Sequence, residues 1–221
     1  MPAARAPLLS LSAKGQIGGH RRGPRRLVSP LTSIVYPTLD AYIDAQAPLN
    51  NYGADSWLYF GVSFLGGTKL YRWRSIINFD LSGLIGRTLT DASLTAYSQI
   101  GAGGSVPATF YRLTPPGTVT EYGVTWNKYD GVNNWLAPGG DWHPTLPTPL
   151  PYTFTGSPGT VVIPGFLPFC QDAIDNRAGA LRFMLKANNE GQVNIFAAIA
   201  SRQNVTPPAH FPYLTIVSAA P

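Results

Sequence analysis

Apolar and polar residues alternate along most of the chain between residues 34 and 218, with the two-residue period of half-buried β-strands. The clearest case is 69–81, where Trp73 and Ile77 fall on one face and Arg74 falls on the other. Alternation or a short apolar run predicts further strands over 40–45, 57–64, 91–100, 107–113, 160–163, 180–187, 192–201 and 211–218.

Turn-forming clusters such as "PLNNYGADS", "GAGGS" and "NNEGQ" separate these segments, and only residues 165–179 could hold a helical turn or two. Period-two segments without helical crossovers imply antiparallel pairing and two sheets packed face to face. The sequence therefore predicts an all-β fold, an antiparallel β-sandwich of jelly-roll type. We assign it to residues 36–221 and treat residues 1–35 as an extended, basic N-terminal arm.

Composition supports this division. Of the 221 residues, 12% are charged, and 21 prolines and 23 glycines suit many short strands joined by turns. Residues 1–30 hold 6 of the 16 basic residues and none of the 11 acidic ones, so the remainder carries 10 basic against 11 acidic residues. The net charge of +5 thus belongs to the arm, and the body has no general affinity for polyanions. The single cysteine, Cys170, reads as a small apolar core residue.

The arm is predicted to bind a partner. Alone it cannot bury enough surface to offset its chain entropy, so we expect it to order on another subunit, with folding back onto its own domain as the alternative. Four arginines without interleaved aromatics are few for nucleic acid, and no stretch approaches the ~20 apolar residues of a membrane span. It is also a poor secretory signal. The predicted contact residues are Arg5, Leu8, Leu9, Lys14, Arg21, Arg22, Arg25 and Arg26.

Four ordered motifs resemble those of the DNRLRE family, the disaggregatase-related β-sandwich modules that are grouped with carbohydrate-binding modules. They are "DAYIDAQAPLNNYG" (40–53), "RSIINFDL" (74–81), "VTWN" (124–127) and the closing "SR" (201–202) with "PYL" (212–214). The resemblance covers about residues 38–218 and implies a β-sandwich. Family members carry an acid after the closing "SR", whereas this chain has Gln203.

The opening "PLLSLSAKGQIGG" is similar to the start of several tailed-phage structural proteins. Combined with the arm, this resemblance implies a non-enzymatic structural protein of a virion, first a capsid decoration protein whose arm anchors it to the major capsid protein or to copies of itself. A tail or head–neck accessory protein is the second expectation in that class. A carbohydrate-binding module that recognises a cell-surface or matrix polysaccharide is the alternative class, and the two could coexist.

Candidate chemistry is sparse. None of His20, His143 and His210 lies in a nucleophile–base motif, so we expect no catalysis. Asp130 and Asp141 lie in one loop-rich region, but paired carboxylates need a geometry that the sequence does not specify.

Metal binding has little support either. No metal cluster is predicted, although Asp40, Asp44 and Asp55 offer oxygen ligands for a structural calcium ion.

Aromatic residues offer a glycan platform, since flat rings stack on the apolar faces of sugars. Tyr52, Trp57 and Trp135 are the candidates for exposed rings. Packing is the competing role for the tryptophans of 126–142: Trp126 belongs to a fold-defining motif, and the proline-rich excursion over 136–151 needs apolar side chains to hold it against the sandwich.

Overall fold

The computed structural model describes residues 29–65, 69–102, 104–155, 158–191, 194–204 and 210–219. Within these ranges the chain is nearly all strand, with one short 3₁₀ turn and the helix α1 (Leu167–Asn176). The strands are β1 (Leu31–Val35), β2 (Pro37–Asp44), β3 (Trp57–Leu65), β4 (Lys69–Asp80), β5 (Leu89–Ala102), β6 (Ser105–Leu113), β7 (Trp142–His143), β8 (Leu150–Thr155), β9 (Gly159–Pro164), β10 (Ala180–Ala187), β11 (Ile195–Ala200) and β12 (Tyr213–Ser218).

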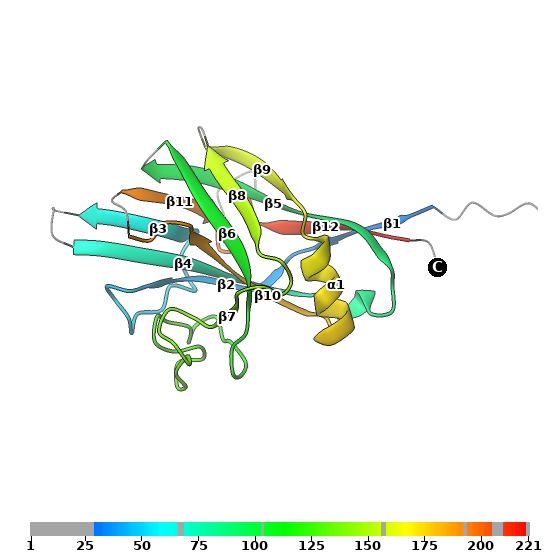
Figure 1. The fold of residues 1–221 in the computed structure, drawn as a ribbon, viewed down its shortest axis with the longest axis horizontal. Helices are drawn as coiled ribbons and strands as arrows, with labels where there is room; N and C mark the ends of the chain where they lie inside the picture. Colours follow the sequence, from blue (N-terminus) through cyan, green and yellow to red (C-terminus); the bar gives the residue numbers. More distant parts are fainter. Residues whose placement is uncertain are drawn as a thin grey trace, which may run out of the picture.

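The strands form two layers, and every pairing among them is antiparallel. The back sheet contains β1, β12, β5, β11 and β3, with β9 on the other edge of β5; the front sheet contains β4, β10 and β6, with β2, β7 and β8 beside them (Figure 1). β3 joins the layers, because it pairs with β11 and also with β4. This confirms the predicted jelly-roll β-sandwich.

Gly61 lies where β3 passes from one layer to the other. Its φ of +114° is a conformation that side-chain-bearing residues rarely adopt, and a Cβ there would collide with the main-chain oxygen of Ile195. Glycine therefore lets the strand bend at this corner.

A main core fills the space between the layers, and aromatic side chains dominate it. Phe60, Phe110, Phe154, Phe166 and Phe183 are all fully buried there. Alternation over the predicted strand 91–100 places Ala92, Leu94 and Ala96 on one face, and all three belong to this core. Cys170 also lies in it, and burial raises the pKa of its thiol to about 12.

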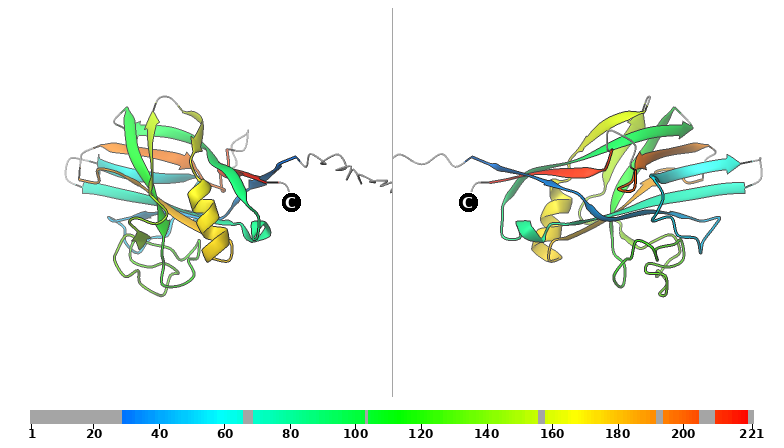
Figure 2. Two further views of the ribbon diagram at one scale, coloured as in Figure 1. Left: turned by 45° about the vertical axis from the view of Figure 1, so that its right-hand side comes forward. Right: turned by 180° about the vertical axis from the view of Figure 1, so that it is seen from behind.

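A second core lies on the opposite face of the front sheet, under the long segment 114–149, which we call the cover segment. Ile76 and Met184 project from the sheet into it, while Trp126, Tyr129 and Trp135 project from the cover segment. Figures 1 and 2 show this segment below β2 and β10. β4 is therefore buried on both faces, although its sequence alternates.

Three elements differ from the sequence-based expectations. No strand was predicted at β8, and only its first two residues belong to the proline-rich excursion over 136–151. Among the described strands it pairs with β6 alone, and an edge strand tolerates Pro151 because one of its sides needs no hydrogen bonds. Helix α1 has 10 residues, longer than a turn or two, with Phe169, Cys170, Ala173 and Ile174 on its buried face. No helix in the described part of the chain is long and apolar enough to cross a membrane.

The third difference concerns the boundary of the arm. Residues 31–35, which the sequence assigned to the arm, form β1 and pair in register with β12 (Figure 2, right). The chain thus enters the sandwich by residue 31, before the expected boundary at residue 36.

Candidate functional site

The outer face of the back sheet carries a row of aromatic side chains, which we call the aromatic strip. Its members are Tyr36, Trp57, Tyr59, Tyr97, His210 and Tyr213. The His210 ring stacks on Tyr97, with centroids 3.8 Å apart and planes 4° apart, and the Trp57 and Tyr97 rings lie 6.2 Å apart. Tyr36 is 57% exposed, and the other rings are partly exposed. Partly exposed rings offer flat apolar area with a polar edge.

Strand register explains why these rings stand together. β11 lies between β3 and β5, and its outward residues are Phe196, Ala198 and Ala200. The Phe196 ring lies against Tyr59 and Trp73, and the two alanines lie nearer to Trp57 and Tyr97. Ala200 pairs with Trp57, so a bulky ring on β3 lies beside a methyl group on β11. Tyr97 on β5 contacts the same Trp57 ring. Both alanines are almost completely buried. Ala198 and Ala200 thus leave room on the central strand for the neighbouring Trp57 and Tyr97 rings to approach each other.

The aromatic array continues beyond the strip at Tyr59. The Tyr59 ring lies 5.2 Å from Tyr42 and 5.6 Å from Trp73, and Tyr52 stacks on Tyr42 with centroids 4.3 Å apart. Burial raises the pKa values of Tyr42, Tyr52 and Tyr59, so their phenols stay neutral. Two predicted platform residues, Tyr52 and Trp57, therefore lie in one partly exposed array.

Trp135, the third predicted platform residue, is placed differently. It is 4% exposed, lies in the second core, and its indole Nε1 donates a hydrogen bond of 3.0 Å to the Thr125 carbonyl. A buried ring cannot stack on a sugar, so the prediction of an exposed Trp135 is wrong. The competing role, packing of the cover segment on the sandwich, is the one that the structure gives it.

Two hollows border the strip. A cleft of about 630 Å³ is lined by Tyr36, Pro37, Arg202 and Phe211. A second hollow, of about 200 Å³, shares Phe211 with the cleft and is lined by Thr95, Ala96, Tyr97, Thr160, His210, Phe211 and Tyr213. The larger cleft falls in the size range of small-molecule sites in proteins.

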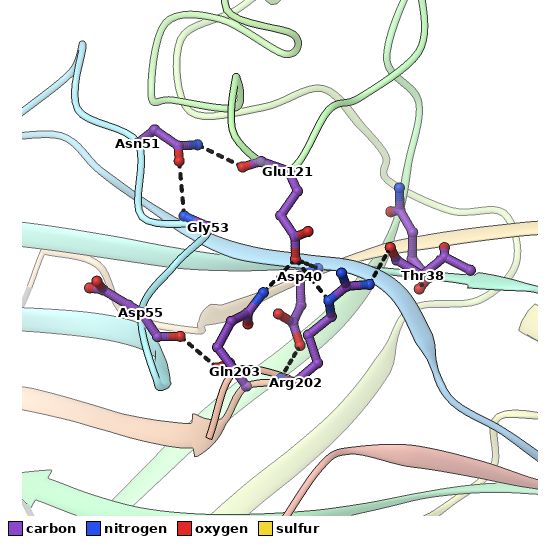
Figure 3. Close-up of polar contacts among 10 residues, drawn as sticks. Thr38, Asp40, Asn51, Gly53, Asp55, Glu121, Arg202 and Gln203 are labelled. Carbon is purple, nitrogen blue, oxygen red and sulfur yellow. Dashed lines mark hydrogen bonds and ion pairs between the residues drawn. The ribbon is translucent and has the colours of Figure 1, made fainter. Parts of the chain in front are cut away.

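Arg202 is fixed at the cleft by a buried polar cluster (Figure 3). Its Nε lies 3.1 Å from Glu121 Oε1, and its Nη1 donates to the Thr38 carbonyl at 2.6 Å. Its main-chain N–H donates to Asp40 Oδ2 at 2.8 Å, and Gln203 Nε2 donates to Glu121 Oε1 at 2.7 Å. The guanidinium therefore has a fixed position and a neighbouring carboxylate that compensates its charge.

The motifs that resemble the DNRLRE family meet at this cluster. Asn51 Nδ2 donates to the main-chain oxygens of Glu121 and Val124, both at 2.7 Å, and the Ser201 hydroxyl donates to the Asp55 carbonyl at 2.5 Å. The opening and closing motifs thus tie three loops together. Gln203 donates a hydrogen bond to the Glu121 carboxylate, whereas the acid that family members carry at this position would repel that carboxylate.

Asp40 is the most perturbed carboxyl of the cluster. Burial raises its pKa from 3.8 to about 7; the Glu121 carboxylate also raises it, while the hydrogen bond from the Arg202 main chain opposes the shift. Its Oδ1 and the Gln203 Oε1 are buried and lack hydrogen-bond partners among the described residues. Their side chains point toward one another in Figure 3.

The three aspartates named as calcium ligands have separate local partners. Asp40 accepts from Arg202, Asp44 accepts from the main-chain N–H of Gln46 at 2.9 Å, and Asp55 is hydrogen-bonded to Tyr42. Among the residues that the structure describes, no three His, Cys, Asp or Glu side chains are placed to hold a metal ion.

The other polar candidates serve as local caps. His143 Nδ1 accepts the main-chain N–H of Leu146 at 2.9 Å, and Asp130 accepts that of Asn133 at 2.6 Å. Asp141 accepts the N–H groups of Leu136 and Ala137. These bonds stabilise turns within the cover segment.

Sequence reasoning missed most of the strip. Tyr59, Tyr97 and Tyr213 all fall on outward positions of the predicted strands. The periodicity was a usable signal, but which outward aromatics become neighbours depends on strand pairing.

Residues 32–135 match the sequence model of carbohydrate-binding module family 96. The match spans β1 to β6 and much of the cover segment, and it includes Tyr36, Trp57, Tyr59 and Tyr97. No curated protein matches the chain. The narrower resemblance to the DNRLRE family stays a prediction.

The predicted partner-binding residues of the arm, Arg5 to Arg26, lie outside the described residues. Anchoring to a capsid protein, self-association through the arm and a place in the virion therefore stay predictions, as does the absence of catalysis.

Proposed function

We propose that this protein is a carbohydrate-binding module whose aromatic strip stacks on the sugar rings of a polysaccharide. The observation that carries the proposal is the arrangement of Trp57 and Tyr97 on either side of the small residues of β11, on a solvent-facing sheet. The family 96 match over residues 32–135 supports it independently.

The chemistry of the strip suits sugars. A pyranose presents C–H groups on its faces and hydroxyl groups at its rim, so it needs flat apolar contacts and nearby polar atoms. Tyr97 and Trp57 supply the flat area, while Gln99 and Thr160 are uncharged polar residues beside them. The open cleft at Tyr36 and Arg202 extends this surface, which leaves room for a chain of sugars rather than a single one.

Replacing Trp57 with alanine is expected to weaken polysaccharide binding about tenfold or more, because the loss of one central aromatic contact of about 1.4 kcal/mol has that effect. Affinity electrophoresis of the full chain in gels that contain a panel of soluble polysaccharides identifies the ligand, and isothermal titration measures the change. Trp57→Phe keeps a flat ring and should retain most of the affinity.

Leu136→Ala provides the control, because Leu136 is 83% exposed and lies in the cover segment beside Thr114 and Trp142, on the outer face of the other sheet. Its affinity should equal that of the wild type. Melting temperatures of all three variants show whether a loss of binding reflects unfolding. Wild-type affinity in folded Trp57→Ala would contradict the proposal, as would a panel without any bound polysaccharide.

A further inference from the structure

Strand β1 forms a free edge of the back sheet. It pairs with β12 from Leu31 opposite Ser218 to Val35 opposite Leu214, and no described strand pairs with its other side. Figures 1 and 2 show β1 and β12 projecting together from one end of the sandwich. The unpaired side of an edge strand presents main-chain N–H and C=O groups that can pair with a strand of another chain.

β1 lacks the features that usually protect an edge strand. Its sequence, LTSIV, contains no charged residue, proline or glycine, and its pairing with β12 shows no bulge. Leu31 is 43% exposed, Ile34 is 48% exposed, and Tyr36, directly after the strand, is 57% exposed. Natural proteins protect free edges with charged side chains, prolines or bulges, because unprotected edges associate. β1 is therefore suited to pairing with another strand.

The back sheet has a second edge at β9, which is less suited to pairing. Among the described strands β9 pairs with β5 alone, and it begins at Gly159 and ends at Pro164. Glycine weakens a strand, and proline removes a hydrogen-bond donor. Val162 in β9 is 59% exposed and gives a matched position for control substitutions.

The residues just before β1 do not favour a return of the chain along the same edge. A two-residue hairpin turn through Ser29 and Pro30 would need a positive φ at Ser29, which serine disfavours. An I′ turn would also need a positive φ at Pro30, whose ring fixes φ at about −65°. Arg25 and Arg26 come shortly before, and their charges do not suit a position beside the apolar Leu31. The strand that covers this edge is therefore sought outside the same chain.

The sequence of β1 is complementary to itself. When two copies of this strand overlap fully in antiparallel order, residue 33 faces itself, residue 31 faces residue 35, and residue 32 faces residue 34. Leu31 of each copy then lies beside Val35 of the other, on the face where Val35 packs against the main core. Thr32 and Ile34 meet on the outer face. The pairing covers exposed apolar side chains and brings no charges together.

Antiparallel order also separates the basic segments of the two copies. Residues 1–30 hold 6 of the 16 basic residues and none of the 11 acidic ones, and they precede β1 directly. The N-terminal ends of two antiparallel strands lie at opposite ends of the pair, so the two basic segments start far from one another. Parallel strands would start them side by side, where like charges repel.

We propose that β1 binds the β1 of a second copy of this chain, as an antiparallel pair centred on Ser33. The two copies then use the same surface, as in other twofold dimers, and the back sheet continues across both. This inference does not depend on the proposed function. A contact of five paired residues is smaller than the roughly 1,200 Å² of the smallest stable interfaces, so the dimer is weak and depends on concentration.

Light scattering of the full chain from about 10 to about 300 µM measures the dimer. We expect the mean mass to rise toward twice that of the monomer. Ile34→Lys should raise the dissociation constant about tenfold or more, because it places two like charges diagonally across the pair. Val162→Lys is the control, because it makes the same kind of change on β9, and it should dimerise like the wild type. Melting temperatures show whether both variants are folded.

A cysteine at the twofold axis tests the register. Facing residues of antiparallel strands have Cα atoms about 4.5–5.5 Å apart, within the range that a disulfide spans. Ser33→Cys should therefore give a covalent dimer under mild oxidation, seen on a non-reducing gel. Cys170 does not compete, because it is buried and burial raises the pKa of its thiol. Val162→Cys measures the background from random collisions.

Three results would overturn the proposal. The first is a wild type that stays monomeric over the whole concentration range, with no more cross-linking in Ser33→Cys than in Val162→Cys. The second is a dimer that folded Ile34→Lys retains or that Val162→Lys loses, because another surface would then form it. The third is a monomer in which hydrogen exchange finds the β1 amides equally protected at every concentration, because residues 1–28 of the same chain would then cover the edge.

Discussion

Replacing Arg74 with methionine is expected to lower the free energy of unfolding by about 3–5 kcal/mol, the range for breaking a buried ion pair by removal of one partner. Arg74 is 6% exposed and lies between two indole rings, with its guanidinium carbon 4.8 Å from the Trp126 centroid and 5.0 Å from that of Trp142. It also donates to both carboxylate oxygens of Glu190 and, at 2.7 Å, to the Gly139 carbonyl. Its loss leaves a nearly buried carboxylate without its arginine and removes the contact that fastens the cover segment to β4.

Urea unfolding of the full chain measures this effect. Arg87→Ala is the control, because no hydrogen bond or ion pair is found for the Arg87 side chain among the described residues, so its stability should stay within about 0.5 kcal/mol of the wild type. Arg74→Met combined with Glu190→Gln should recover part of the loss, because the unpaired charge is then gone. A loss below 1 kcal/mol in Arg74→Met would show that the cover segment is held by its apolar contacts alone.

Replacing Asp40 with asparagine is expected to raise the free energy of unfolding relative to that of the wild type increasingly as the pH rises. The Asp40 carboxyl has a pKa of about 7 in the folded protein against 3.8 without its surroundings, so between these values the folded state holds a proton that the unfolded state has released. The wild type therefore loses stability as the pH rises through this window, by about 2–4 kcal/mol in total. Asparagine cannot ionise, and its amide can donate toward the unpartnered Gln203 Oε1.

Urea unfolding at pH 4.5 and pH 8.0 tests this sign. The stability of Asp40→Asn relative to the wild type should be greater at pH 8.0 than at pH 4.5. Asp80→Asn is the control, because the main-chain hydrogen bond from Ser82 lowers the pKa of Asp80. The stability that its carboxylate contributes is lost only below its unfolded pKa of 3.8, so the difference between Asp80→Asn and the wild type should be nearly the same at pH 4.5 and pH 8.0. A pH-independent difference for Asp40→Asn would exclude a buried, protonated Asp40.

Alternation predicted the strands because the side chains of a strand face opposite sides, and one side of most strands here meets the main core. The segments 91–100 and 180–187 lie within the observed β5 and β10. The sequence did not predict β8, because pairing at a sheet edge tolerates the prolines that usually end a strand. It did not predict β1 either, because these five residues lack charge and strict alternation and were assigned to the arm. Local pattern does not report which edges of a sheet are free.

The predicted glycan platform also shows what local pattern can and cannot predict. Sequence reasoning named three aromatics by residue type and surrounding loops, and it could not tell a ring that packs from a ring that faces solvent. Trp57 and Trp135 are chemically alike, yet one is partly exposed beside Tyr97 and the other is buried under the cover segment. The difference arises because residues 114–149 cover the outer face of the front sheet, while the strip lies on the outer face of the back sheet.

The sequence by itself determined the fold class, the concentration of positive charge before residue 31 and the near-neutral body, because periodicity and composition are properties of the chain alone. Only the tertiary structure decided which rings share a surface, which carboxyl is buried enough to titrate near pH 7, and which cations are already paired. Those properties depend on contacts between residues as far apart as Thr38 and Arg202, which form only when the strands find their register.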